Sequence, residues 1–185
     1  MEIKEQIILE TMHQFETNGL KFTMQDVAHG LHIAKKTIYQ FYPSKEDLMT
    51  GVLDYAFEKI QEDKRKIIDM DMPITDKIRT IMIAMPDQYN LLDFRKLSDL
   101  HEKYPKVDER LHMHLESNWE PVIQLLHQGM EEGKIKKIDI PVLQAMITSG
   151  MEYFLSTDVL KNNQISYHDA LNEMMDIIMK GIEQK

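Results

Sequence analysis

The strongest constraint on this sequence lies near its start, where two short predicted helices, about 24–31 and 35–42, are separated by only about three residues. Thr23 and Asp26 have the spacing of a capping box, in which side chain and backbone exchange hydrogen bonds at a helix start. The helix over 24–31 has apolar residues at i, i+3, i+4 and i+7, which are Met24, Val27, Ala28 and Leu31. This spacing predicts that one face of the helix packs against the protein core. A capped helix, a tight turn and a second short helix together predict a helix-turn-helix.

The remainder of the chain also has the pattern of helices. Only seven Gly and six Pro occur among 185 residues, and 43 % of the residues are hydrophobic, which is enough to bury a core. Periodicity and caps predict further helices over about 2–17, 45–68, 74–85, 87–103, 107–132, 140–161 and 167–184. Pro121 should kink the helix over 107–132. We therefore expect an all-α fold, with a three-helix domain over 1–48 and a second helical domain over 49–185.

The second helix of the motif has two chemically different sides. At about 100° per residue, Ile38, Phe41 and Tyr42 fall on one side and are expected to face inward. The opposite side carries two cations, an aromatic ring and an amide, which are Lys35, Lys36, Tyr39 and Gln40. These groups can meet phosphates, thymine methyls and base edges in a DNA major groove. On spacing alone, an ordinary solvated helix face is an equally good interpretation.

The run from Val27 to Leu48, VAHGLHIAKKTIYQFYPSKEDL, resembles the DNA-binding signature of the TetR family of transcriptional regulators. Its most specific part is Thr-Ile-Tyr, followed by an aromatic pair and Ser-Lys-Glu-Asp-Leu. The resemblance covers about the first 48 residues. Beyond them, only a Met-Glu-Glu-Gly-Lys-Ile segment is similar to the family's penultimate turn. The resemblance implies an all-helical dimer with an N-terminal DNA-binding domain and a C-terminal domain for ligand sensing and dimerisation.

The resemblance also implies a role for each matching residue. Thr23 is expected to cap its helix and touch phosphate, Thr37 to contact backbone phosphate, and Lys45 to grip phosphate beside the positive end of a helix. The side chains expected to face the groove are Lys35, Lys36, Tyr39 and Gln40. Two positions depart from the family pattern. His32 replaces the usual turn glycine, and Ala34 replaces the usual small cap residue. Both changes are expected to reduce the stability of the local helix, but neither removes a side chain that faces DNA.

The sequence contains fifteen Met residues, and core packing is the simpler interpretation for most of them. Together with several aromatic residues, they are also compatible with an adaptable apolar binding site in the C-terminal domain. We expect a small, largely apolar effector to bind beside the kinked helix. The candidate pocket residues are Tyr89, Phe94, His101, Trp119, His127, Met151, Tyr153 and Phe154. The last two predicted helices carry apolar stripes that suit either a dimer seam or inward packing, and the family resemblance favours a homodimer. The candidate interface residues are Met146, Gly150, Leu171, Met175, Ile178 and Ile182.

Composition and residue spacing argue against several other kinds of protein, including disulfide-rich, metal-binding and membrane-spanning ones. The absence of Cys excludes a disulfide scaffold, a thiolate zinc site and a Cys nucleophile. His112 and His114 point about 200° apart on a helix, so they cannot share a metal ion. The first residues are charged and polar, and no apolar run approaches the ~20 residues of a membrane span. We expect a cytoplasmic protein that is not an enzyme and has no metal or cofactor.

These observations predict a ligand-responsive transcriptional regulator, a repressor that binds a palindromic double-stranded DNA operator as a homodimer and is released by a small molecule. The net charge of −9 argues against a general nucleic-acid coat, although no acidic residue occurs between Val27 and Ser44. The same charge supports an alternative: a helical small-molecule or protein-interaction module without DNA-binding function.

Overall fold

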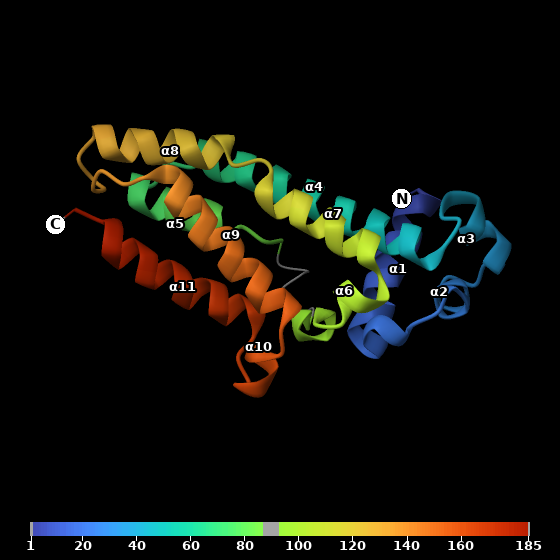
Figure 1. Ribbon diagram of the computed structural model, residues 1–185. Helices are drawn as coiled ribbons and strands as arrows, with labels where there is room; N and C mark the ends of the chain where they lie inside the picture. Colours follow the sequence, from blue (N-terminus) through green and yellow to red (C-terminus); the bar gives the residue numbers. More distant parts are fainter. Residues whose placement is uncertain (1, 87–92, 185) are drawn as a thin grey trace.

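The computed structural model describes residues 2–86 and 93–184, and its regular elements are helices (Figure 1). They are α1 (Ile3–Asn18), η1 (Gly19–Lys21), α2 (Met24–Gly30), α3 (Lys35–Phe41), α4 (Lys45–Asp69), α5 (Ile74–Met82), η3 (Phe94–Leu97), α6 (Leu100–Lys103), α7 (Pro105–Glu116), α8 (Glu120–Glu131), α9 (Ile140–Ser156), α10 (Val159–Asn162) and α11 (Tyr167–Ile182). The expected all-α class is confirmed. Within the described ranges, no helix combines the length and apolarity needed to cross a membrane.

The helices separate into an N-terminal unit and a longer bundle that α4 connects. In Figure 1, α1–α3 form one end of the molecule, and the C-terminus lies at the other. Apolar side chains are buried in two clusters. The first joins α1–α4 to α7 and the start of α11, and the second lies among α5, α8, α9 and α11. Because the first cluster includes Ile7, Leu48 and Leu171, residues on both sides of position 48 share one core.

The N-terminal turn has the hydrogen bonds that the sequence predicts. Thr23 Oγ1 accepts from the Asp26 amide at 3.2 Å, and Asp26 Oδ2 accepts from the Thr23 amide at 2.8 Å, which confirms the capping box. His32 has a φ of 54°, in the left-handed region that favours glycine. Ala34 precedes α3 without a side-chain cap. The two departures therefore have the expected consequences: His32 adopts a backbone conformation that favours glycine, and α3 begins without a side-chain cap.

The inner side of α3 differs in one residue from the prediction. Ile38 is fully buried and Tyr42 nearly so, but Phe41 is 39 % exposed. The Tyr42 ring lies against α4, where a Cβ added to Gly51 would approach the ring to 2.5 Å. Tyr42, four residues after Ile38, therefore occupies the inner position, and Phe41 remains at the edge of the short helix.

The predicted kink at Pro121 is wrong. One helix, α7, ends at Glu116, the chain turns at Asn118 with a φ of 61°, and a new helix, α8, begins with Pro121 in its first turn. A proline fits there because amides in the first turn have no helical acceptor to lose. The segment predicted over 140–161 is likewise divided, into α9 and α10.

Candidate DNA-binding face and ligand cavity

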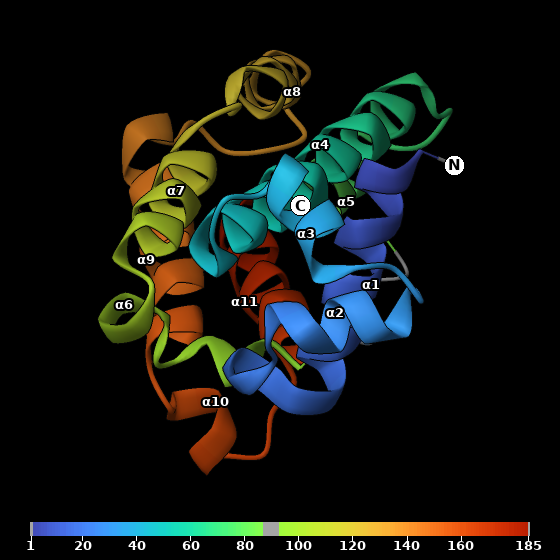
Figure 2. The same cartoon turned by 90° about the vertical axis from the view of Figure 1, so that its right-hand side faces the viewer.

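The outer face of α3 presents the predicted groove-facing residues to solvent. Lys35, Lys36, Tyr39 and Gln40 are exposed, and Thr37 is half-buried. The Lys35 ammonium lies 5.6 Å from the centre of the Tyr39 ring. Figure 2 looks onto this end of the molecule, with α2 and α3 toward the viewer. The outer face of α3 therefore offers two ammonium groups, an amide and an aromatic ring that remain exposed in the described chain.

The two flanking phosphate candidates have different surroundings. Thr23 is exposed beside the start of α2, where its hydroxyl serves the cap. The Lys45 ammonium instead donates to the Leu20 carbonyl at 2.7 Å and lies 4.1 Å from the Phe22 ring and 5.1 Å from the Tyr104 ring. The Lys45 side chain is thus directed into the protein. Its predicted contact with phosphate requires the ammonium to leave the Leu20 carbonyl.

Two hydrogen bonds join the end of α1 and the start of α4 to η3 and α7, in addition to the apolar contacts of the first cluster. At the start of α4, Glu46 Oε1 accepts from the Lys106 amide of α7 at 3.1 Å. At the end of α1, Lys96 of η3 donates to the Glu16 carbonyl. Gly19, with a φ of 56°, lies over the same lysine, and a Cβ there would be 3.4 Å from its side chain. η3 and α7 are therefore in direct contact with the end of α1 and the start of α4.

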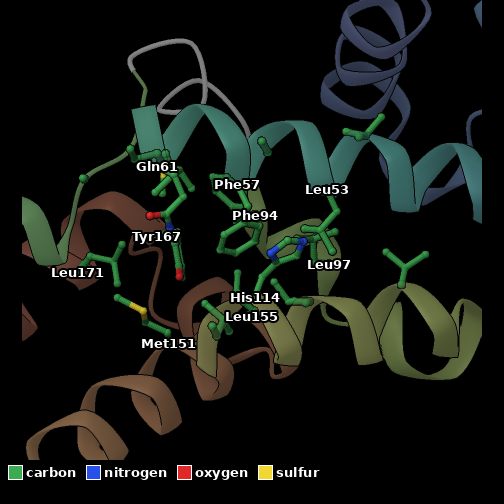
Figure 3. A pocket seen from close by; sticks show the side chains of 18 of the residues that line it. Leu53, Phe57, Gln61, Phe94, Leu97, His114, Met151, Leu155, Tyr167 and Leu171 are labelled. Atoms are coloured by element: carbon green, nitrogen blue, oxygen red, sulfur yellow. The ribbon is translucent and has the colours of Figure 1, made fainter. Parts of the chain in front are cut away.

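A cavity of about 200 Å³ runs beside α4, between α1, α7, η3, α9 and the start of α11 (Figure 3). Eight residues of α4 line it, from Met49 to Lys64, which corresponds to about 22 Å at ~1.5 Å per residue. Most of the wall is apolar. Met12, Phe15 and Phe22 belong to the wall, so the N-terminal helical unit closes one end of the cavity.

The structure brings only some of the predicted pocket residues to this cavity. Phe94, Trp119 and Met151 line it, whereas Tyr89 lies outside the described residues. Four others do not line it, which are His101, His127, Tyr153 and Phe154. His101 bonds to Asp108 at 3.0 Å with its side chain 79 % exposed, and His127 faces solvent on α8.

Tyr153 and Phe154 of α9 miss the cavity, and helix phase explains the position of Tyr153. Met151 and Leu155 lie four residues apart and share the inward face. Tyr153 lies about 200° from Met151 and is 55 % exposed. Phe154 is half-buried and packs against the first cluster without reaching the cavity wall.

Polar groups on the cavity wall were missed by the sequence analysis. They include Gln61 and Lys64 on α4, His114 on α7 and Tyr167 at the start of α11, and the hydroxyl residues Thr11 and Ser117 also line the cavity. Burial lowers the pKa of Lys64 to about 8 and raises the pKa of Tyr167. One sequence signal was available for Lys64: it continues the apolar stripe of α4, fifteen residues after Met49.

His114 is already engaged within the protein. Its Nε2 lies 2.7 Å from Asp54 Oδ1, and its ring stacks on Phe57 at 4.3 Å between centres. Although burial raises the pKa of Asp54, hydrogen bonds from Arg110 and His114 outweigh that effect and hold the pKa below its usual range. This cluster joins α4 to α7 along the cavity.

Three of the six residues predicted for the dimer seam are buried inside the protomer, and the dimer itself stays a prediction. Leu171, Met175 and Ile182 are 3 %, 0 % and 9 % exposed, because this stripe of α11 packs inside the protomer. Ile178 is half-buried against the second cluster, and Gly150 lies against Met174 of α11.

The exposed apolar residues of these two helices lie on other faces. On α9 they are Val142, Met146 and Tyr153, at 55 %, 60 % and 55 % exposure. Their spacing of i, i+4 and i+11 places them on one stripe. Ile177 of α11 is 63 % exposed. Of the predicted interface residues, Met146 alone belongs to this stripe of α9.

Comparisons with known proteins agree with the architecture. Residues 7–52 match the family model of bacterial regulatory proteins, tetR family. YvaF, an uncharacterized HTH-type transcriptional regulator of Bacillus subtilis (strain 168), is 22 % identical over 179 residues, covering 96 % of this chain and 94 % of that protein.

Two solved structures have a similar fold. A TetR transcription regulator from Haloarcula marismortui has a TM-score of 0.74 at 16 % identity, with 98 % of each chain covered. FadR from Bacillus subtilis, crystallised with stearoyl-CoA, has a TM-score of 0.69 at 18 % identity, covering 97 % of this chain and 99 % of that chain. The resemblance of the N-terminal region to the TetR family is confirmed.

Proposed function

Because the N-terminal region of this chain is that of a TetR-family transcriptional regulator, we propose that the protein is a repressor that binds a palindromic operator as a homodimer and is released by a small, largely apolar effector. The observation that carries this proposal is the shared cavity wall. Met12 and Phe15 come from α1 of the helix-turn-helix unit, whereas Met151 and Leu155 come from α9. A molecule in the cavity would touch both units at once.

Residues 1–48 serve as the DNA-binding domain in this proposal. Two copies of α3 enter successive major grooves of double-stranded DNA, about 34–36 Å apart. The bases are read by the exposed face of α3, and the phosphates are held by Thr23, Thr37 and Lys45. For Lys45, binding means exchanging the Leu20 carbonyl for a phosphate oxygen.

Release follows from a difference in effector affinity between two arrangements of the N-terminal unit. Phe94 and Leu97 of η3 line the cavity, and Lys96 between them holds the end of α1. An effector that displaces η3 therefore displaces α1, provided that it binds the DNA-incompetent arrangement more tightly. Typical coupling lowers operator affinity about 5–150-fold. FadR with stearoyl-CoA supports an apolar effector, since its fold is similar.

Removal of side chains from the exposed face of α3 should weaken operator binding. Lys36→Ala and Gln40→Ala should each weaken operator binding by about 1–3 kcal/mol and relax the preference at particular base pairs, because each removes a base contact. Fluorescence anisotropy with labelled operator measures both effects. Lys137→Ala, at an exposed position remote from α3 in sequence, is the matched control. Wild-type binding by both α3 variants would contradict this assignment.

Selection of bound DNA from a random pool tests the proposal as a whole. Recovery of a palindrome whose binding weakens with salt supports the regulator. The net charge of −9 favours one alternative, a helical small-molecule or protein-interaction module without DNA-binding function. That alternative predicts that no sequence is enriched, while molecules that fit the cavity still raise the thermal stability.

A further inference from the structure

The cavity beside α4 is chemically different at its two ends. At the end nearest α1, its wall is formed by Met12, Phe15 and Phe22. Toward the end of α4, Gln61 and Lys64 join the wall, together with Tyr167 of α11. Figure 3 shows the Gln61 and Tyr167 side chains at one end of the cavity, away from Leu53 and Leu97.

None of these three polar side chains forms a hydrogen bond or ion pair within the described part of the chain. The neighbouring lysines of α4 are engaged elsewhere: Lys59 pairs with Glu62 at 2.9 Å, and Lys66 pairs with Asp63 at 2.6 Å. Buried polar groups in proteins nearly always have a partner, and a half-buried ammonium needs one most. The partner for Lys64 is therefore expected from a ligand in the cavity.

The shape of the cavity restricts that ligand further. The lining residues of α4 extend over about 22 Å, and the volume is about 200 Å³, so the space is long and narrow. Apart from Thr11, the end nearest α1 offers few polar partners, and the His114 ring is already held by Asp54. A charge on the ligand is thus favoured at the Lys64 end only.

We propose that the effector is an elongated apolar molecule with one terminal carboxylate, which pairs with Lys64 while the chain extends along α4 toward Met12 and Phe22. This inference rests on the function proposed above and specifies its ligand class. Gln61 and Tyr167 hold the carboxylate or the atoms next to it by hydrogen bonds. The whole cavity measures only about 200 Å³, which disfavours enclosure of a large headgroup such as a nucleotide beside the apolar chain.

Trp119 provides a direct measurement of occupancy, because it is the single Trp in the sequence and lines the cavity. Dodecanoate, its methyl ester and dodecylamine are titrated below their micelle concentrations while Trp119 fluorescence is recorded. The wild-type protein should bind dodecanoate most tightly. Lys64→Met should raise the Kd for dodecanoate about 10–100-fold and leave the methyl ester unchanged.

The matched control is Lys66→Met, which removes an exposed lysine from the same helix and should bind dodecanoate like the wild type. Lys64→Gln gives a second variant, and circular dichroism verifies that each variant is folded. Equal binding of acid and ester by the wild type, or an unchanged Kd in both folded Lys64 variants, would overturn the inference. Tighter, Lys64-dependent binding of dodecanoyl-CoA would assign the anion to a phosphate and also overturn it.

An operator-binding assay with the same ligands separates this inference from the proposed function. Lys64-dependent binding of dodecanoate that never alters operator affinity would leave the carboxylate site standing and reject effector release. Release of the operator equally by acid and ester would support the regulator and reject the role of Lys64.

Discussion

Replacing Met175 with glutamate is expected to unfold the protein, whereas the same replacement at Ile177 is expected to leave it folded. Met175 is fully buried in the second cluster, and Ile177 is 63 % exposed. Loss of a buried Met side chain costs about 2–5 kcal/mol. An unpaired carboxylate in the same place adds several kcal/mol, so the sum is comparable to the ~5–15 kcal/mol of a typical domain. Urea unfolding followed by circular dichroism measures both variants.

Met175→Leu is the control for this pair, since a volume-conserving apolar exchange in a core costs less than about 1.5 kcal/mol. The experiment distinguishes two roles for the same stripe of α11. If Met175→Glu stays folded and sedimentation velocity shows a monomer, the stripe covers a partner subunit, as predicted from the sequence. If it unfolds while Ile177→Glu retains its stability, the stripe belongs to the core of the protomer.

This ambiguity shows what helical periodicity can and cannot predict. A stripe that contains Leu171, Met175 and Ile182 indicates that one face of the helix is covered, but the same pattern serves a core and a dimer seam. The outcome depends on packing against α5 and α9, which are distant in the sequence. Capping signals such as Thr23 and Asp26 are local, and the structure has them where they were expected.

The cavity illustrates the same difference between local and distant information. The run of apolar residues along α4 was visible in the sequence, and Lys64 stood within it as a polar exception. The contribution of Phe15 and Phe22 depends on the contact between α1 and α4. The residues around Pro121 are compatible with either a helix kink or a helix start. In the structure the chain turns at Asn118, so Pro121 lies in the first turn of a new helix.

Replacing Met146 with glutamate is expected to produce a folded monomer that has lost most of its operator affinity. The stripe of Val142, Met146 and Tyr153 is apolar and exposed, and such patches mark association sites. A charge at its centre opposes pairing of the same face across a two-fold axis. Without the dimer, the second half-site no longer adds to binding, so affinity should fall by about 10²-fold or more. Sedimentation velocity and anisotropy with full-length operator measure the two effects.

A half-site oligonucleotide identifies the cause of that loss. Met146→Glu leaves the α3 face untouched, so its affinity for a half-site should equal that of a wild-type DNA-binding unit, and only the gain from the second half-site should disappear. Met113→Glu places the same charge on an exposed methionine of α7, at 53 % exposure, and should remain dimeric. Should Met146→Glu remain dimeric while Met113→Glu dissociates, the interface lies along α7, and the geometry that sets the distance between the two copies of α3 must be derived from that face.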